Sequence, residues 1–213
     1  MNSIAIDDIR RLMVHLSAVM DGHRDELIRL DGQVGDGDLG LTMSKGFKVA
    51  SEETMSSSEG DIGKLLMRAG MAMAKSAPST MGTLVATGFI SGGKAVSGGT
   101  ELDAAAFASF LSSFVEGVMQ RGKSKPGEKT LLDVLYPAAE ALKEAVSSGA
   151  TLSDALSACR RAAEAGYEES KQLIAQHGRA AYYREQSIGK EDPGAAAALY
   201  FVQGLHEFIS EQE

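Results

Sequence analysis

The feature that most constrains the fold is a helical spacing of apolar residues that returns along most of the chain. One such series is Ile9, Leu12, Met13, Leu16, Val19 and Met20, and another is Leu132, Leu135, Ala138, Ala139, Leu142 and Val146. Intervals of three and four residues place side chains on one face of an α-helix, whereas a half-buried strand alternates with a period of two. The spacing therefore predicts amphipathic helices that share a core.

Signals for strands are weak. Aromatic residues make up 6% of the chain, and its long segments are rich in Ala, Leu, Met, Glu and Lys, which favour helix. We expect about eight antiparallel helices, over residues 4–30, 40–53, 61–76, 81–97, 103–121, 130–148, 152–176 and 194–211. The connections between them are short, and we find no internal repeat and no long linker. The sequence therefore predicts a single all-α domain over residues 1–213.

The charge pattern narrows the choice of partners and compartment. The chain has 21 basic and 29 acidic residues, a net charge of −8, and no Lys/Arg run of the kind that nucleic-acid phosphates attract. The N-terminal residues do not have the pattern of a signal peptide, and no stretch approaches the roughly 18 uncharged apolar residues that span a bilayer. The single cysteine, Cys159, cannot form an internal disulfide. We expect a cytoplasmic protein with no nucleic-acid or membrane partner.

Three aspartates lie within eight residues among four glycines, in the segment LDGQVGDGDLG (30–40). On a helix Asp36 would point about 140° away from Asp31, and the glycines disfavour helix. A loop that brings Asp31, Asp36 and Asp38 together is the better prediction. Carboxylates that converge repel one another, and an oxygen-only cluster suits Mg²⁺, Mn²⁺ or Ca²⁺ better than zinc. An acidic surface loop that binds no ion would explain the same residues.

A calcium-binding EF-hand loop fails when its positions are counted. With Asp36 at the first position, the required glycine would be Leu41 and the bidentate glutamate would be Phe47. Magnesium usually completes its coordination with water and substrate phosphates, which implies a nucleotide. Neither a Walker A sequence nor a kinase-type glycine-rich motif is present. Backbone N–H groups in 76–83 could meet phosphates at the head of a helix, although Pro78 is also an ordinary helix-start residue.

The segment 177–194 combines basic residues with a helix start. Asp192 has the character of an N-cap and Pro193 that of a first helical residue. Arg179, Arg184 and Lys190 could complement phosphate, although basic residues in loops are usually solvated.

Four segments in order resemble the L subunit of dihydroxyacetone kinase, the DAK2-type domain of the single-chain enzymes. They are LDGQVGDGDLGLTMSKGF (30–47), RAGMAMAKSAPSTMGTL (68–84), GKSKPGEKTLLDVLYPA (122–138) and GRAAYYREQSIGKEDPGAAA (178–197). The resemblance implies a barrel of eight antiparallel helices that binds ADP or ATP at one end through two Mg²⁺ ions. It places Asp31, Asp36 and Asp38 on the family's three magnesium ligands.

The resemblance also implies a set of nucleotide positions. These are Leu39, Gly40, Leu41, Thr42, Ser76, Ala77, Gly122, Leu131, Arg179, Asp192, Pro193 and Gly194. Gly122 and Leu131 would line the base, Arg179 would lie beside the nucleotide, and 192–194 would close over it. The backbone at Ser76 and Ala77 would meet the phosphates.

The implied activity is that of a phosphotransferase subunit. In the family a separate K subunit holds the ketose on a histidine, and the L subunit delivers the γ-phosphoryl group to it. We therefore expect a K-type partner that holds dihydroxyacetone or a related short ketose. We assign no side chain of this chain a certain catalytic role, because metal ions and positioning carry phosphoryl transfer. The donor would be ATP or a phosphotransferase-system protein that rephosphorylates ADP. A homodimer is compatible with the sequence.

Two departures separate the chain from the family pattern. Leu39 and Thr42 stand where the family usually has His and Asn, so a donor near the phosphates is lost. The segment KSAPST (75–80) replaces a glycine-rich loop, which leaves less freedom for close backbone approach. These changes leave the donor and the sugar open. They also motivate an alternative, a non-catalytic ADP-binding module that contacts a transcription factor.

Overall fold

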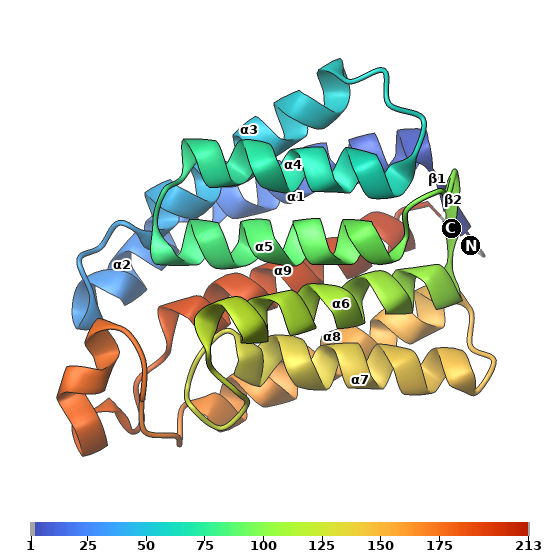
Figure 1. Cartoon of the computed structure of the whole chain (residues 1–213). Helices are drawn as coiled ribbons and strands as arrows, with labels where there is room; N and C mark the ends of the chain where they lie inside the picture. The colour runs from blue at the N-terminus through green and yellow to red at the C-terminus, as the bar shows by residue number, and fades with distance from the viewer. Residues whose placement is uncertain (1–2, 213) are drawn as a thin grey trace.

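The computed structural model describes residues 3–212, and nearly all of its ordered elements are helices (Figure 1). The α-helices are α1 (Ile6–Gly22), α2 (Arg24–Val34), α3 (Leu39–Ser56), α4 (Ile62–Ser76), α5 (Thr80–Ala95), α6 (Ala104–Gly122), α7 (Leu132–Ser147), α8 (Leu152–Ser170) and α9 (Pro193–Ser210). The other elements are a 3₁₀-helix, η1 (Arg179–Ser187), and two strands, β1 (Ser3–Ala5) and β2 (Glu101–Asp103).

Eight of the helices described in residues 3–212 close into a ring. Helix α1 packs on α3, each helix from α3 to α8 packs on the next, and α9 returns to α1. Neighbours in the ring run in opposite directions (Figure 1). Helix α2 lies outside the ring and packs on α3 and α9. The prediction of an all-α barrel of antiparallel helices is confirmed.

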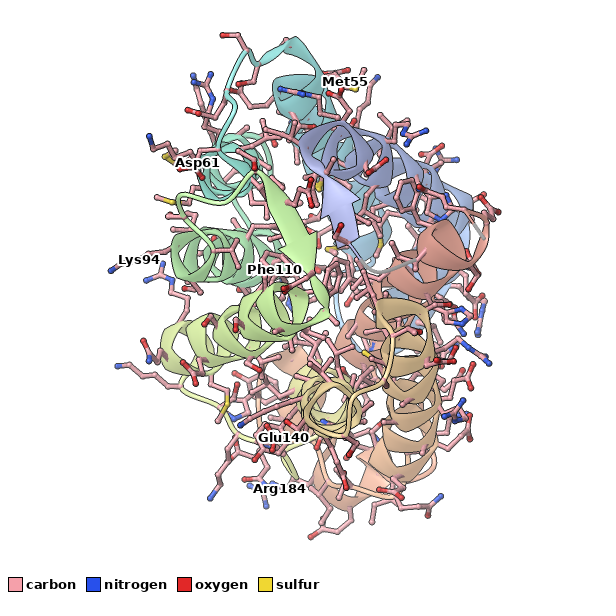
Figure 2. All side chains as sticks on the ribbon, turned by 90° about the vertical axis from the view of Figure 1, so that its right-hand side faces the viewer. Met55, Asp61, Lys94, Phe110, Glu140 and Arg184 are labelled. Atoms are coloured by element: carbon pink, nitrogen blue, oxygen red, sulfur yellow. The ribbon has the colours of Figure 1, made fainter. Side chains whose placement is uncertain are left out.

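Aromatic rings fill the middle of the barrel. Five phenylalanines from four helices form one cluster, with neighbouring ring centroids 5.3 to 6.3 Å apart: Phe47, Phe89, Phe110, Phe114 and Phe201. Figure 2 looks at the barrel from the end that carries the strands, with Phe110 inside the ring of helices and Lys94 at its rim. Edge-to-face and offset contacts of this kind add to the free energy gained by burying the rings.

The structure differs from the sequence prediction at four places, one of which is the 3₁₀-helix η1 in a segment where no helix was predicted. The helix predicted over 4–30 breaks at His23, whose ring stacks on Tyr200 with centroids 3.7 Å apart, and the chain continues as α2. The helix predicted over 152–176 ends at Ser170. The last difference is the pair of strands, in which Ile4 lies opposite Leu102 and both are buried. Three-residue strands carry too short a pattern to be found by alternation.

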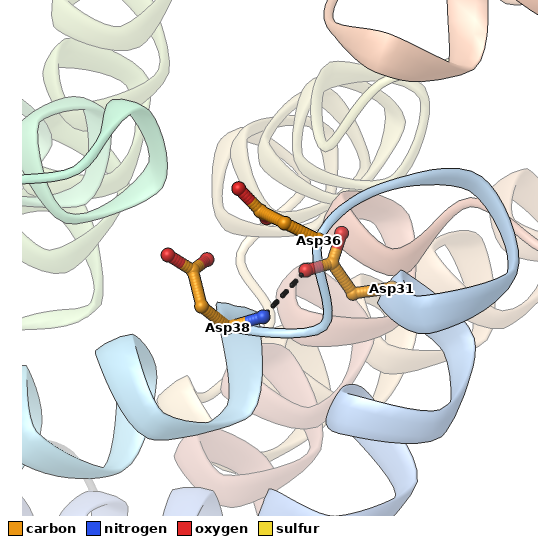
Figure 3. Close-up of side chains that lie close together, drawn as sticks. All are labelled: Asp31, Asp36 and Asp38. Carbon is orange, nitrogen blue, oxygen red and sulfur yellow. Dashed lines mark hydrogen bonds between the residues drawn. The ribbon is translucent and has the colours of Figure 1, made fainter.

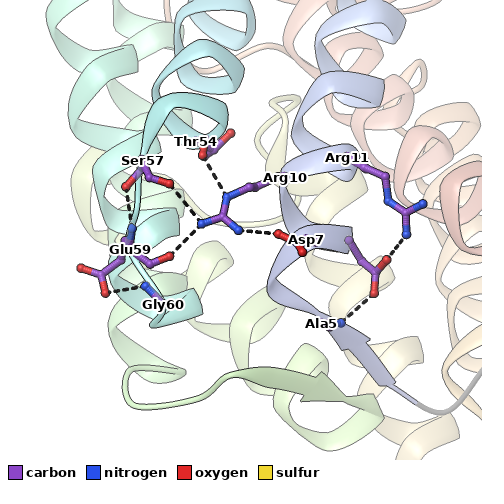
Figure 4. Close-up of polar contacts among 9 residues, drawn as sticks. Ala5, Asp7, Arg10, Arg11, Thr54, Ser57, Glu59 and Gly60 are labelled. Carbon is purple, nitrogen blue, oxygen red and sulfur yellow. Dashed lines mark hydrogen bonds and ion pairs between the residues drawn. The ribbon is translucent and has the colours of Figure 1, made fainter.

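Arg10 ties α1 to the end of α3 (Figure 4). Its guanidinium donates to the carbonyls of Thr54, Ser57 and Glu59 at 3.3, 3.1 and 2.8 Å. It also pairs with Asp7 at 2.6 Å. These contacts satisfy carbonyls at and beyond a helix C-terminus, where cations are favoured. Across the described residues, every helix falls short of the length and hydrophobicity that a bilayer crossing requires.

Candidate functional site

The turn between α2 and α3 lies at the end of the barrel opposite the strands (Figure 1), and the three aspartates lie side by side there (Figure 3). One carboxylate oxygen from each of Asp31, Asp36 and Asp38 lies within 4.8 Å of the others. Asp31 is in the last turn of α2, Asp36 is in the turn that follows, and Asp38 is the N-cap residue of α3. The expected convergence is therefore present. The expectation that all three lie in a loop is wrong for Asp31, because α2 continues through Gly32.

The turn between α2 and α3 wraps around the Asp31 carboxylate. Asp31 Oδ2 accepts hydrogen bonds from the backbone N–H groups of Asp38 and Leu39 at 3.0 and 3.2 Å. A Cβ atom on Gly35 would overlap Asp31 Oδ1, and Gly37 has a φ of +74°, in the left-handed region. These two glycines thus serve the turn directly, one by leaving room for a carboxylate and the other by its backbone conformation.

The charges of the cluster are only partly balanced by the protein. Arg179 Nη2, from η1, lies 2.7 Å from Asp36 Oδ2. The pKa of Asp38 is raised by burial of its carboxyl and then by the neighbouring charges of Asp36 and Asp31. An oxygen-only cluster with excess negative charge fits a hard divalent cation such as Mg²⁺. The role of the three aspartates as metal ligands stays a prediction.

The first turn of α3 is packed closely against α2. A Cβ atom on Gly40 would overlap the backbone carbonyl oxygen of Arg24. Leu39 is 5% exposed and belongs to the hydrophobic core, whereas Leu41 is 57% exposed. Thr42 donates its backbone N–H to the Asp38 carbonyl at 2.9 Å, so its side chain is one turn into the helix. Residues 39–42 are the four positions expected to contact the nucleotide here. Among them, the side chain of Leu39 is buried in the hydrophobic core.

Ser76 is the last residue of α4, and Ala77 begins the turn that leads to α5. Ala77 is buried, and its backbone N–H donates to the Met73 carbonyl at 2.9 Å. Ser79 is the N-cap of α5 and accepts from the N–H of Gly82 at 3.0 Å. The first N–H groups of a helix lack intrahelical partners, and Gly82 already donates to Ser79, so the donors available to an anion are the N–H groups of Thr80 and Met81 at the start of α5. This favours α5 over Ala77 as the source of phosphate contacts.

The positions expected to line a base lie at the ends of α6 and α7. Gly122 is the last residue of α6 and lies against Leu84, and Leu131 immediately precedes α7. Leu131 is buried and lines an apolar cavity between Met81 and Phe201 of about 10 Å³. Such a volume admits about one water molecule, so a nucleotide base would lie outside this cavity.

The start of α9 lies beside Leu131, at the start of α7. Asp192 caps α9 by accepting from the N–H of Ala195 at 2.7 Å, and Pro193 is the first helical residue. The predicted helix start is thereby confirmed. A Cβ atom on Gly194 would lie 3.6 Å from the backbone nitrogen of Leu131. Burial raises the pKa of Asp192 to about 6. Closure of this segment over a nucleotide stays a prediction.

Sequence reasoning missed the side chains that shape the loop before α7. The Asp133 carboxylate accepts from the backbone N–H groups of Gly127 and Thr130 at 2.5 and 2.7 Å. Lys129, in the same loop, is 3% exposed and donates to three backbone carbonyls. Nothing in the surrounding KPGEKT sequence distinguishes this lysine from a solvated one, because its partners are distant in sequence.

Comparison with known proteins gives the family. Residues 33–207 match the DAK2 domain, which is most of the chain. The chain belongs to the DAK2 domain family. The match includes Asp36 and Asp38 and begins just after Asp31.

Two relatives of similar length are kinase subunits. The chain is 30% identical over 203 residues to the ADP-binding subunit DhaL of the PEP-dependent dihydroxyacetone kinase of Escherichia coli, covering 95% of this chain and 97% of the relative. It is 35% identical over 182 residues to the ADP-binding subunit DhaL of PEP-dependent dihydroxyacetone kinase 1 of Listeria innocua, covering 85% and 86%. The predicted family is confirmed, and so is the predicted class of enzyme, a phosphotransferase.

A solved structure has the same fold. The dihydroxyacetone kinase from C. freundii, in complex with AMP-PNP and Mg²⁺, superposes with a TM-score of 0.71 at 22% sequence identity. The superposition covers 93% of this chain, which spans about a third of the length of that kinase (33%). This likeness shows the barrel fold.

Proposed function

We propose that this chain is the nucleotide-binding, phosphoryl-transferring subunit of a dihydroxyacetone-type kinase. It delivers phosphate to dihydroxyacetone or a related short ketose that a separate K-type subunit holds. The observation that carries this proposal is the cluster of Asp31, Asp36 and Asp38, with Arg179 beside it, in a chain that matches ADP-binding kinase subunits along nearly its whole length.

The residues of the barrel end have distinct tasks in this proposal. Asp31, Asp36 and Asp38 would hold two Mg²⁺ ions, and such ions neutralise phosphate charge during phosphoryl transfer. The first turn of α5 supplies N–H groups to phosphate oxygens, and Gly122 and Leu131 border the base. Arg179 adds the positive charge of its guanidinium beside Asp36. The whole chain serves as a single domain for ADP or ATP, in the cytoplasm.

Calorimetry tests the metal and nucleotide site. We expect the wild type to bind ADP only with Mg²⁺ present. We expect Asp36→Asn to weaken that binding at least about tenfold, because it replaces a charged metal ligand with a neutral side chain of almost the same size. Glu140→Gln is the matched control, since Glu140 is exposed on α7 and loses the same charge. Equal affinity in Asp36→Asn, or no binding by the wild type, would overturn the proposal.

Leu39 gives a second candidate function. It puts a buried hydrocarbon where the family has a histidine donor, which favours a non-catalytic ADP-binding module that contacts a transcription factor. Turnover of dihydroxyacetone in a mixture reconstituted with a K-type subunit would exclude this candidate. Binding of Mg²⁺ and ADP without turnover would support it.

The phosphate donor and the assembly need separate measurements. Slow exchange of bound ADP against labelled ATP would indicate a resident cofactor that a phosphotransferase-system protein recharges, and rapid exchange would indicate ATP as a substrate. Sedimentation of the isolated chain would separate a homodimer from a monomer.

A further inference from the structure

We propose that Lys129 is a positioning residue, which sets Arg179 against Asp36 by clamping the base of the segment that carries Arg179. The inference rests on the proposed function, because it assigns Lys129 to the same nucleotide and metal site. Lys129 lies outside the acidic cluster and acts on it through the segment that carries Arg179.

The ammonium group of Lys129 has all its donors occupied. It donates to the carbonyl oxygens of Lys171, Leu173 and Ser187 at 3.1, 3.3 and 2.7 Å. A lysine ammonium has three N–H donors, and each has a partner here. The side chain is therefore committed to backbone carbonyls and cannot also bind a phosphate directly. Its backbone φ of +56° lies in the left-handed region, an uncommon conformation for lysine.

These three carbonyls lie at the two ends of residues 171–187, a segment that projects from the barrel. After Leu173 the chain leaves the barrel, forms η1 with Arg179 at its start, and returns at Ser187. The base is closed further by two hydrogen bonds, from the Ala175 N–H to Ser187 Oγ at 3.0 Å and from the Gly189 N–H to the Lys171 carbonyl at 2.7 Å. The Nζ atom of Lys129 thus joins the beginning of this segment, at Lys171 and Leu173, to its end at Ser187.

Beyond its base this segment makes few contacts with the hydrophobic core. Tyr182 in η1 is 88% exposed, and Ser187 at its end is the one buried residue of that helix. Segments with few buried contacts open locally at low free energy. The position of Arg179 therefore depends on the base, on its ion pair with Asp36, and on Glu128 beside Lys129. The Glu128 carbonyl accepts from the Gln176 N–H at 3.2 Å, and its carboxylate lies 2.6 Å from His177 Nε2.

Simple capping of α8 does not account for the whole arrangement. A lysine near a helix C-terminus often binds the last carbonyls, and the bonds to Lys171 and Leu173 fit that role. The shortest of the three bonds goes instead to the carbonyl of Ser187, at the opposite end of the segment from α8. The loop that presents Lys129 is itself shaped by Asp133 and runs between Gly122 and Leu131. Lys129 therefore couples the loop beside the base to the segment beside the metal ligands.

A double-mutant cycle tests the inference. Lys129→Met keeps the length of the side chain and removes its charge, and Lys143→Met is the matched control at an exposed position on α7. We expect Lys129→Met to weaken Mg²⁺-dependent ADP binding about tenfold, with Lys143→Met unchanged. We expect Arg179→Ala to weaken binding too, and Lys129→Met to add little in its presence. A lysine with a general structural role would instead weaken binding by the same factor with or without Arg179.

Amide hydrogen exchange gives a readout that needs no nucleotide. Faster exchange confined to 174–188 in Lys129→Met supports the clamp, whereas unchanged exchange there, or an equal increase throughout the barrel, overturns it. If Lys129→Met does not fold, Lys129→Gln carries the same measurements, because it keeps a polar donor but removes the charge and shortens the reach to the three carbonyls. If the wild type binds no ADP, the proposed function fails, and exchange in 174–188 still decides whether Lys129 clamps the segment.

Discussion

A methyl group added at Gly35 should disable the acidic cluster without touching a carboxylate. The Cβ atom of Gly35→Ala would overlap Asp31 Oδ1, closer than the 3.0 Å that real Cβ atoms keep from other heavy atoms, and would lie 3.0 Å from Asp31 Cγ. The backbone at Gly35, with φ of −135°, is not in the left-handed region. The clash with the carboxylate is therefore the reason that alanine does not fit.

The expected magnitude follows from the hydrogen bonds that Asp31 makes. If its carboxylate turns away, it loses the bonds from the N–H groups of Asp38 and Leu39. Each bond to a partly exposed carboxylate contributes about 1 kcal/mol, so we expect a loss of about 2 kcal/mol in the free energy of unfolding. We also expect Mg²⁺-dependent ADP affinity to fall by about tenfold or more, because one of three metal ligands is displaced.

Gly32→Ala provides a matched control three residues away. A Cβ atom there meets nothing within 4 Å, and Gly32 lies inside α2, where alanine is favoured over glycine by about 0.5 kcal/mol or more. Urea unfolding in the presence of a chelator and calorimetry with ADP and Mg²⁺ would measure both effects. If Gly35→Ala were as stable as the wild type and bound ADP equally well, the account of the turn given above would be refuted.

Two further predictions concern buried titratable groups. Because the pKa of Asp192 is about 6 when folded and 3.8 in the unfolded reference, the folded state binds this proton more tightly, and stability should fall by up to about 3 kcal/mol as the pH rises from about 4 to about 6. Asp192→Asn retains the helix cap and should flatten that part of the urea-unfolding profile; an unchanged profile would contradict the assignment. Burial raises the pKa of Cys159 to about 12, so a thiol reagent at pH 8 should label it only on unfolding, and rapid labelling of the native protein would contradict its place in the core.

Much of the barrel was predictable because local patterns and tertiary contacts agree. The apolar series that begins at Ile9 and the one that begins at Leu132 both lie on the buried faces of helices, and Asp192 with Pro193 starts α9 as expected. The break at His23 had one sequence signal, the preceding Gly22. The apolar spacing from Met20 to Leu27 nevertheless continues a helical pattern across the break, so periodicity alone joins α1 to α2.

The parts of the site that the sequence did not predict depend on contacts between distant residues. The spacing of the aspartates, with glycines between them, predicted that they converge, but not that Asp31 is helical. The pairing of Arg179 with Asp36 joins residues far apart in the chain, as do the bonds from Lys129 to the carbonyls beyond α8. Residue type and local spacing carry no information about partners at such separations.

The closed ring of helices also has a consequence for the order of folding on the ribosome. Helix α9 packs on both α1 and α8, and its Phe201 stacks on Phe114 near the centre of the aromatic cluster, with ring centroids 5.3 Å apart. Helices α1 to α8 therefore emerge before the element that completes their core. During synthesis they would present an open aromatic groove, the kind of exposed surface that chaperones bind. A nascent chain stalled before α9 should be far more sensitive to protease than one that extends beyond it.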